Sequence, residues 1–144
     1  MIALPDVNTL IALAWPNHVH HDAARTWFAA ARAAGWATCA ITEAGFVRVS
    51  CNRSAVGHEV TPLDALALLR RLRRRGSHTF WVQERSITSL PDEILTRIQG
   101  YRQITDAVLV ALAMQHAGRL ATFDGGIKSL LPKTRQPSVH VIPV

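Results

Sequence analysis

The sequence predicts an α/β protein in which a central parallel sheet is covered by helices on both faces. Short apolar runs alternate with longer segments of helical spacing along the 144 residues. Signals for hairpin turns between the apolar runs are few, which favours parallel over antiparallel pairing. Apolar residues make up 49% of the chain, enough for one hydrophobic core. We therefore expect a single domain spanning residues 1–144 with a sheet of four to five short strands.

The first third of the chain begins with a strand followed by two helices. Ile2–Leu4 is a short apolar run that Pro5 stops, and Asn8–Ala14 follows with apolar residues at helical spacing. The segment His20–Ala34 is rich in alanine and helical by propensity, and Gly35 provides its end. This order predicts a strand, a turn and two helices.

A second strand and helix come next. Ala37–Ile41 is an apolar run of strand length, and Thr42 is placed to cap a helix that runs from Glu43 to about Ser50. We therefore expect a second strand of the sheet, followed directly by a helix that begins at Glu43.

The strongest helix start lies at Thr61-Pro62-Leu63-Asp64. A capping threonine, a proline at the first helical position and an acid three residues after the cap together form an N-terminal signature. We expect this helix to run to Arg75 and to end at Gly76.

The last half of the chain supplies the remaining strands and one long helix. Pro91 opens a short helix, and Thr105 is expected to cap a long apolar helix that ends before Gly118. Three further runs are rich in strand-forming residues. They are Thr79–Val82, Leu120–Phe123 and Val139–Ile142.

Composition limits the compartment and the class of partner. The N-terminus lacks a basic leader, no apolar run is long enough to span a membrane, and the two cysteines lie in apolar segments, so we expect a cytoplasmic protein without a disulfide scaffold. The net charge of +6 favours a polyanionic partner. The basic run Arg70–Arg75 either caps its helix or contacts RNA or a protein partner, and the sequence leaves both open.

Four of the ten acidic residues stand where a parallel sheet would gather them. Asp6, Glu43 and Asp124 follow expected strands, and Asp106 opens the long helix. The carboxyl ends of parallel strands share one rim, where ligands of such sheets bind. Any one of these acids by itself suits the dipole of a helix start. Together they would repel one another, and a hard cation such as Mg²⁺ or Mn²⁺ would compensate that repulsion.

Three segments carry a family resemblance that spans nearly the whole chain. PDVNTLIALAWPNHVHHDAA, AITEAGFVRV and ITDAVLVALAMQHAGRLATFD together resemble a PIN-domain ribonuclease of the VapC toxin type. The resemblance implies a PIN-like α/β/α sandwich. It also implies an Mg²⁺- or Mn²⁺-dependent endoribonuclease toxin of a type II toxin–antitoxin system. Such a toxin cleaves RNA with a metal-activated water, inhibits translation, pairs with a VapB-type antitoxin and forms a homodimer.

The resemblance also assigns residues. The catalytic and metal-binding acids of the family fall on Asp6, Glu43, Asp106 and Asp124, and its supporting polar residues fall on Asn8, Thr105 and Thr122. Gly125 and Gly126 stand after Asp124, where an arginine or another polar residue is more usual. Cleavage by water is expected to leave a 5′-phosphate and a 3′-hydroxyl.

Two other functions are compatible with parts of the sequence. One is a catalytically idle, basic module that binds RNA or protein and whose acids only cap helices. The other is a phosphatase of the haloacid-dehalogenase type with Asp6 as nucleophile, although that motif requires an aspartate where Asn8 stands. The histidines His18, His20 and His21 do not have the spacing of a metal face, and we expect them to pack or to cap the following helix.

Overall fold

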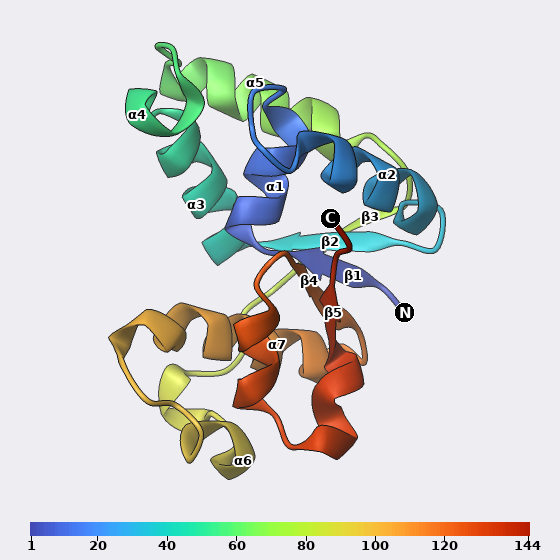
Figure 1. The fold of residues 1–144 in the computed structure, drawn as a ribbon, viewed down its shortest axis with the longest axis vertical. Helices are drawn as coiled ribbons and strands as arrows, with labels where there is room; N and C mark the ends of the chain where they lie inside the picture. The colour runs from blue at the N-terminus through green and yellow to red at the C-terminus, as the bar shows by residue number, and fades with distance from the viewer.

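A computed structural model describes all residues from Met1 to Val144 and contains one five-stranded parallel sheet with the order β3-β2-β1-β4-β5 (Figure 1). All four neighbouring pairs of strands are parallel, which confirms the predicted α/β fold class. The strands are β1 (Ala3–Pro5), β2 (Trp36–Cys39), β3 (His78–Trp81), β4 (Arg119–Thr122) and β5 (Val139–Val141).

Helices cover both faces of the sheet, so the molecule has three layers (Figure 1). The layer drawn above the sheet contains α1 (Val7–Ala14), α2 (His21–Ala31), α3 (Ala40–Ser50), α4 (Arg53–Val56) and α5 (Pro62–Arg73). The layer drawn below it contains α6 (Asp92–Leu95), α7 (Ile104–Gln115) and the short 3₁₀ helices Ile87–Ser89, Tyr101–Gln103, Gly125–Leu130 and Lys133–Ser138.

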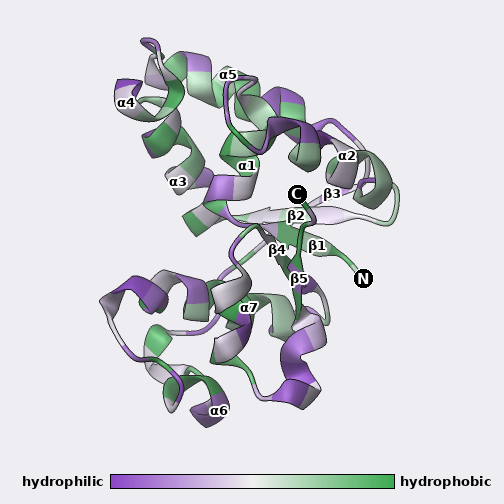
Figure 2. Cartoon of the chain, in the orientation of Figure 1, coloured by the Kyte–Doolittle hydropathy of each residue, from purple (hydrophilic) through white to green (hydrophobic).

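Alternation along the central strands divides the interior into two apolar cores. Ala3 of β1 and Ala121 of β4 pack in the core with α1 and α2, whereas Leu4 and Leu120, one residue away, pack in the core with α7. Side chains of a strand point alternately to its two faces, so both faces of β1 and β4 are buried. Figure 2 shows α1 and β1 as largely hydrophobic, as expected for elements in the middle of the molecule.

The predicted boundary between β2 and α3 was wrong. The strand ends at Cys39 and not at Ile41, and Cys39, not Thr42, is the N-cap of α3. Thr42 is instead the third residue of the helix, where its hydroxyl accepts a hydrogen bond from the Cys39 backbone N–H at 3.0 Å. This reciprocal cap fixes the helix start three residues earlier than the sequence pattern suggested.

The start of α7 also differs from the prediction. Thr105 does not cap this helix, because the 3₁₀ turn Tyr101–Gln103 leads directly into it and Gln103 is the N-cap. By contrast, the capping box of α5 is confirmed: Thr61 and Asp64 each bond the other's backbone N–H. No helix is long and apolar enough to cross a bilayer.

Candidate active site

A cavity of about 530 Å³ lies at the carboxyl ends of β1 and β4. At β1 the strand order turns back, because β2 and β3 lie on one side of it and β4 and β5 on the other. Such a switch point is where open parallel sheets bind their ligands. Six of the seven residues that the sequence assigned to the site line this cavity: Asp6, Asn8, Thr105, Asp106, Thr122 and Asp124.

Asp6 is the most deeply placed of the carboxylates, with a residue exposure of 8%. It caps α1, because its Oδ1 accepts a hydrogen bond of 2.8 Å from the Thr9 backbone N–H. Its Oδ2 accepts a hydrogen bond of 2.6 Å from the Thr122 hydroxyl. Burial raises the pKa of Asp6 above the usual range, although these two hydrogen bonds oppose the rise.

Asp124 is tied to the same threonine. Its backbone N–H donates to the Thr122 hydroxyl at 3.0 Å, and its Oδ1 accepts from the Gly126 N–H at 2.8 Å. Thr122 therefore connects the backbone of one acid with the carboxylate of another. Asp124 itself is exposed at the cavity mouth.

Asp106 stands on the first turn of α7, in the wall opposite α1. It is half-buried, and no side chain or backbone group of the protein donates a hydrogen bond to its carboxylate. Burial, with the nearby charges of Asp6 and Asp124, raises the pKa of Asp106 to about 6. The raised pKa means that negative charge in this cavity lacks compensation.

The chemistry of these three carboxylates suits a hard cation. Oxygen donors are the ligands that Mg²⁺ and Mn²⁺ prefer, and a cation would offset both the burial of the Asp106 carboxylate and its repulsion by Asp6 and Asp124, which together raise its pKa. As the side chains stand, no three His, Cys, Asp or Glu groups lie close enough together to hold one ion. Mg²⁺ usually keeps several waters and few protein ligands, so the three acids can hold an ion partly through water.

Glu43 is the one predicted site residue that does not line the cavity. Its Oε2 accepts a hydrogen bond of 2.5 Å from the Thr38 hydroxyl and lies 3.5 Å from Nη1 of Arg73, at the end of α5. Because α3 begins at Ala40, Glu43 stands at its fourth position and not its first. It lies with Val47 on the side of α3 that faces Leu69 of α5.

The Thr38 hydroxyl also contacts Nε2 of His78 at 2.8 Å. A carboxylate only accepts hydrogen bonds, so the Thr38 hydroxyl donates to Glu43 and the His78 Nε2–H donates to Thr38. Burial and the charge of Arg73 lower the pKa of His78, while Glu43 opposes that change. Neutral His78 therefore donates to Thr38, and Thr38 in turn donates to Glu43 and holds its carboxylate in place.

Two residues with polar side chains that the sequence did not assign to the site also line the cavity. Arg48 of α3 lines the cavity, and its guanidinium is the kind of group best suited to phosphate oxygens. His20, expected only to pack or cap, lies in the cavity wall with its ring stacked on Phe123. No local pattern could have shown that contact, because Phe123 comes from the far end of the chain.

The basic run at the end of α5 is mostly exposed, as a solvated or contact surface would be. Two of its arginines have internal partners. Arg73 pairs with Glu43, and the Arg75 guanidinium lies 5.3 Å from the centre of the Phe28 ring. Part of this run therefore stabilises the fold.

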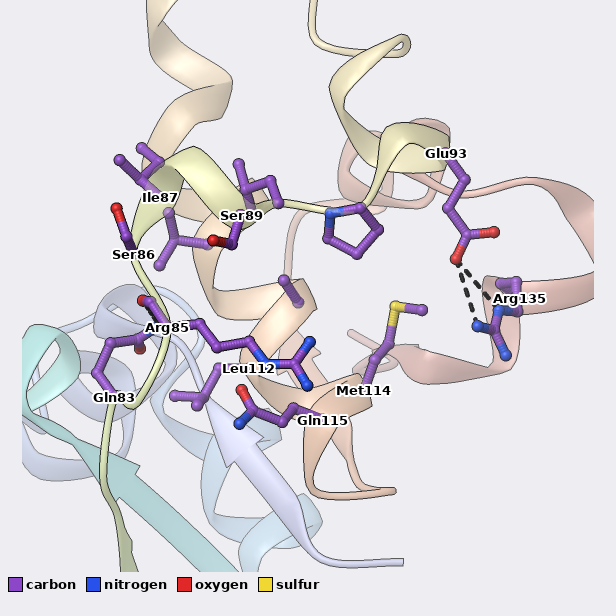
Figure 3. A pocket seen from close by; sticks show the side chains of 14 residues that line it. Gln83, Arg85, Ser86, Ile87, Ser89, Glu93, Leu112, Met114, Gln115 and Arg135 are labelled. Atoms are coloured by element: carbon purple, nitrogen blue, oxygen red, sulfur yellow. Dashed lines mark hydrogen bonds and ion pairs between the residues drawn. The ribbon is translucent and has the colours of Figure 1, made fainter.

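A second cavity, of about 220 Å³, lies between α7 and the segment before α6 (Figure 3). Its one acid, Glu93, is paired with Arg135 at 3.3 Å, and Arg85 points into the space (Figure 3). It has no second carboxylate and therefore no ligand set for a divalent ion.

Comparisons with known proteins agree with this architecture. Residues 3–130 match the PIN domain family. The chain is 43% identical over 143 residues to Ribonuclease VapC38 of Mycobacterium tuberculosis, covering 99% of each chain. It is 46% identical over 127 residues to Ribonuclease VapC39 and 41% identical over 127 residues to Ribonuclease VapC44 of the same species, covering 88% of this chain and 91% and 89% of those proteins. With a family match over most of its length and relatives above 40% identity, the chain belongs to the PIN-domain family as a ribonuclease of the VapC type.

Proposed function

We propose that this protein is an Mg²⁺- or Mn²⁺-dependent endoribonuclease toxin of a type II toxin–antitoxin system. The observation that carries the proposal is the meeting of Asp6, Asp106 and Asp124 around one cavity at the switch point of the sheet. Burial raises the pKa of Asp106 most and the nearby charges of Asp6 and Asp124 raise it further, which supports a cation as the missing partner. The printed names of the relatives, all ribonucleases, support RNA as the substrate.

Each acid has a distinct task in this proposal. Asp6, held by Thr9 and Thr122, is the rigid ligand, and Asp106, free of hydrogen bonds, is the acid with oxygens available to an ion or its waters. Asp124 at the mouth completes the set or orients the attacking water. A bound Mg²⁺ or Mn²⁺ would neutralise phosphate charge and make water a better nucleophile. In-line attack by water on phosphorus, with the P–O3′ bond breaking and the 3′ oxygen taking up a proton, leaves a 5′-phosphate and a 3′-hydroxyl.

Glu43 is the fourth acid of the proposal, and fewer observations support it as a metal ligand. It reaches the ion only through water and only after leaving Thr38 and Arg73, its partners in this structure. Among the supporting residues, Asn8 and Thr105 line the cavity and are available to waters or to RNA, and Thr122 orients Asp6.

The biological part of the proposal follows from the family. The protein pairs with a VapB-type antitoxin, acts as a homodimer in the cytoplasm and arrests translation by cutting RNA. The net charge of +6 and the exposed arginines of α5 suit a polyanionic substrate.

A cleavage assay tests the activity. Total cellular RNA is incubated with the protein in Mg²⁺, in Mn²⁺ and in EDTA, and the ends of the products are mapped. We expect cleavage only with metal, 5′-phosphate ends, and no cleavage by Asp6→Asn. Equal cleavage in EDTA, or by Asp6→Asn, would refute the assignment of the site.

A melting experiment separates the enzyme from an idle binding module. A ligand that binds only the folded state raises its stability, so Mn²⁺ should raise the melting temperature of the parent. It should not do so in the double variant Asp6→Asn/Asp106→Asn. The phosphatase alternative has lost its support, because the PIN match covers residues 3–130.

A further inference from the structure

His20 lies in the wall of the carboxylate cavity, immediately before α2. It shares that cavity with Asp6 and Asp106, yet neither of its ring nitrogens has a hydrogen-bond partner in the protein; only its backbone N–H and carbonyl are hydrogen-bonded. A polar ring that lines a charged cavity without a partner is available to whatever enters it.

The surroundings hold this ring in one place. Its plane stacks on Phe123, with ring centres 4.6 Å apart and an angle of 22°. On another side the ring of His18 lies 5.8 Å away, tilted by 45°. These two aromatic neighbours limit rotation of the His20 ring.

The backbone of His20 is fixed as well. Its N–H donates to Nδ1 of His18 at 3.0 Å, which leaves the proton of the neutral His18 ring on Nε2. That Nε2–H donates to Oδ1 of Asn8 at 3.1 Å. Asn8 stands on the first turn of α1, two residues after Asp6, so this chain of contacts ties the position of His20 to the helix that Asp6 caps.

We propose that His20 is a substrate-positioning residue whose ring N–H donates a hydrogen bond to a phosphate or ribose oxygen of the RNA beside the carboxylates. The inference rests on the proposed ribonuclease function. A role in stacking a nucleobase is disfavoured, because Phe123 already stacks on one face of the ring. The ring nitrogens are the polar atoms of this side chain that have no partner in the protein.

Four variants of the full chain test this role. His20→Ala removes the ring, His20→Gln keeps a side-chain donor, and His20→Phe keeps an aromatic ring without a donor. His116→Ala is the matched control, since His116 also stacks on an aromatic ring, that of Trp81 at 4.4 Å, but does not line the cavity.

Two measurements are made on a short RNA that the parent cleaves. The first is KM and kcat with Mn²⁺; the second is the Kd for the same RNA with each change placed in the inactive Asp6→Asn background. We expect His20→Ala and His20→Phe to raise KM and Kd on the order of tenfold, the size expected for one hydrogen bond to a charged oxygen. We expect His20→Gln to recover most of that loss, with kcat changing less than KM, and His116→Ala to behave as the parent.

The outcomes are distinguishable. If the parent cleaves RNA and His20→Ala binds and cleaves equally well, the inference fails while the proposed function stands. If His20→Phe recovers binding as well as His20→Gln does, the ring only packs and the inference also fails. If the parent cleaves no RNA with metal, the proposed function itself fails, and the inference fails with it because it rests on that function.

Discussion

The Thr122 hydroxyl of β4 donates a hydrogen bond of 2.6 Å to Oδ2 of Asp6 at the end of β1, although the two residues are 116 positions apart. The same hydroxyl accepts from the backbone N–H of Asp124 at 3.0 Å. One hydroxyl therefore connects the carboxylate of Asp6 with the backbone of Asp124. In the proposed site this hydroxyl would orient Asp6 toward the metal ion.

Replacing Thr122 with valine should impair the site more than the fold. Valine keeps the shape but leaves Oδ2 of Asp6 without its donor, so we expect the pKa of Asp6 to rise further and metal affinity or cleavage to fall about 10- to 100-fold. The free energy of unfolding should fall by about 1–2 kcal/mol. Thr122→Ser, which keeps the hydroxyl, is the matched control. Valine and serine variants with equal activity would contradict the role given to this hydroxyl.

Asp106→Asn should alter how stability depends on pH in metal-free buffer. The pKa of Asp106 is raised to about 6, so the folded state holds this proton more tightly than the unfolded state does. Its contribution to stability is complete below about pH 4 and is lost as pH rises to about 6. Asparagine lacks this proton, so at pH 7 the variant should be more stable by about 1 kcal/mol after allowance for solvent screening.

The measurement is urea unfolding of parent and Asp106→Asn at a series of pH values between 3.5 and 7.5, with EDTA present. The difference in unfolding free energy between the two proteins should grow through the window from about pH 4 to about pH 6 and be constant above it. A difference that does not change with pH would mean that the pKa of Asp106 is not raised. Cleavage by the variant should be lost in either case.

Glu43→Gln should reduce cleavage less than Asp6→Asn does. Glu43 is held by Thr38 and Arg73 in this structure, so in the proposed metal site it would act indirectly, and we expect about a tenfold loss of activity. Complete loss would show that Glu43 is a direct ligand, and no loss would show that it only forms the ion pair. Arg73→Met serves as the control, because it breaks the pair and leaves Glu43 charged. With Arg73 largely exposed, the pair itself should contribute at most about 1 kcal/mol to stability.

Gly45→Ala should destabilise the protein through the contact between α1 and α3. A Cβ at Gly45 would overlap Cγ2 of Val7, the residue after Asp6. Inserting a methyl group into packed contacts costs about 1–3 kcal/mol, because side chains or helices must move. Gly100→Ala is the matched control, since its added Cβ meets nothing within 4 Å. Thermal unfolding of both variants measures the effect. Equal melting temperatures would mean that α1 and α3 can move apart to admit the added methyl group without loss of stability.

The sequence by itself determined the class of fold and the positions of three acids in it. Apolar runs set the strands to within a residue or two, and the capping pattern at Thr61 predicted a helix start that the structure contains. Asp6 and Asp124 follow strands that are both parallel members of the sheet, so their meeting follows from topology. Such local signals are sufficient because strand and helix ends depend on neighbouring residues.

Only the tertiary structure decided where Glu43 points and what His20 contacts. The sequence pattern put Glu43 at the first position of its helix, but the cap between Cys39 and Thr42 starts α3 three residues earlier, which moves Glu43 about 4.5 Å along the helix axis from its start. Its carboxylate then meets Arg73. The stacking of His20 on Phe123 joins segments from opposite ends of the chain. Contacts of this kind depend on how the helical layers pack around the sheet, so they cannot be predicted from a local sequence pattern.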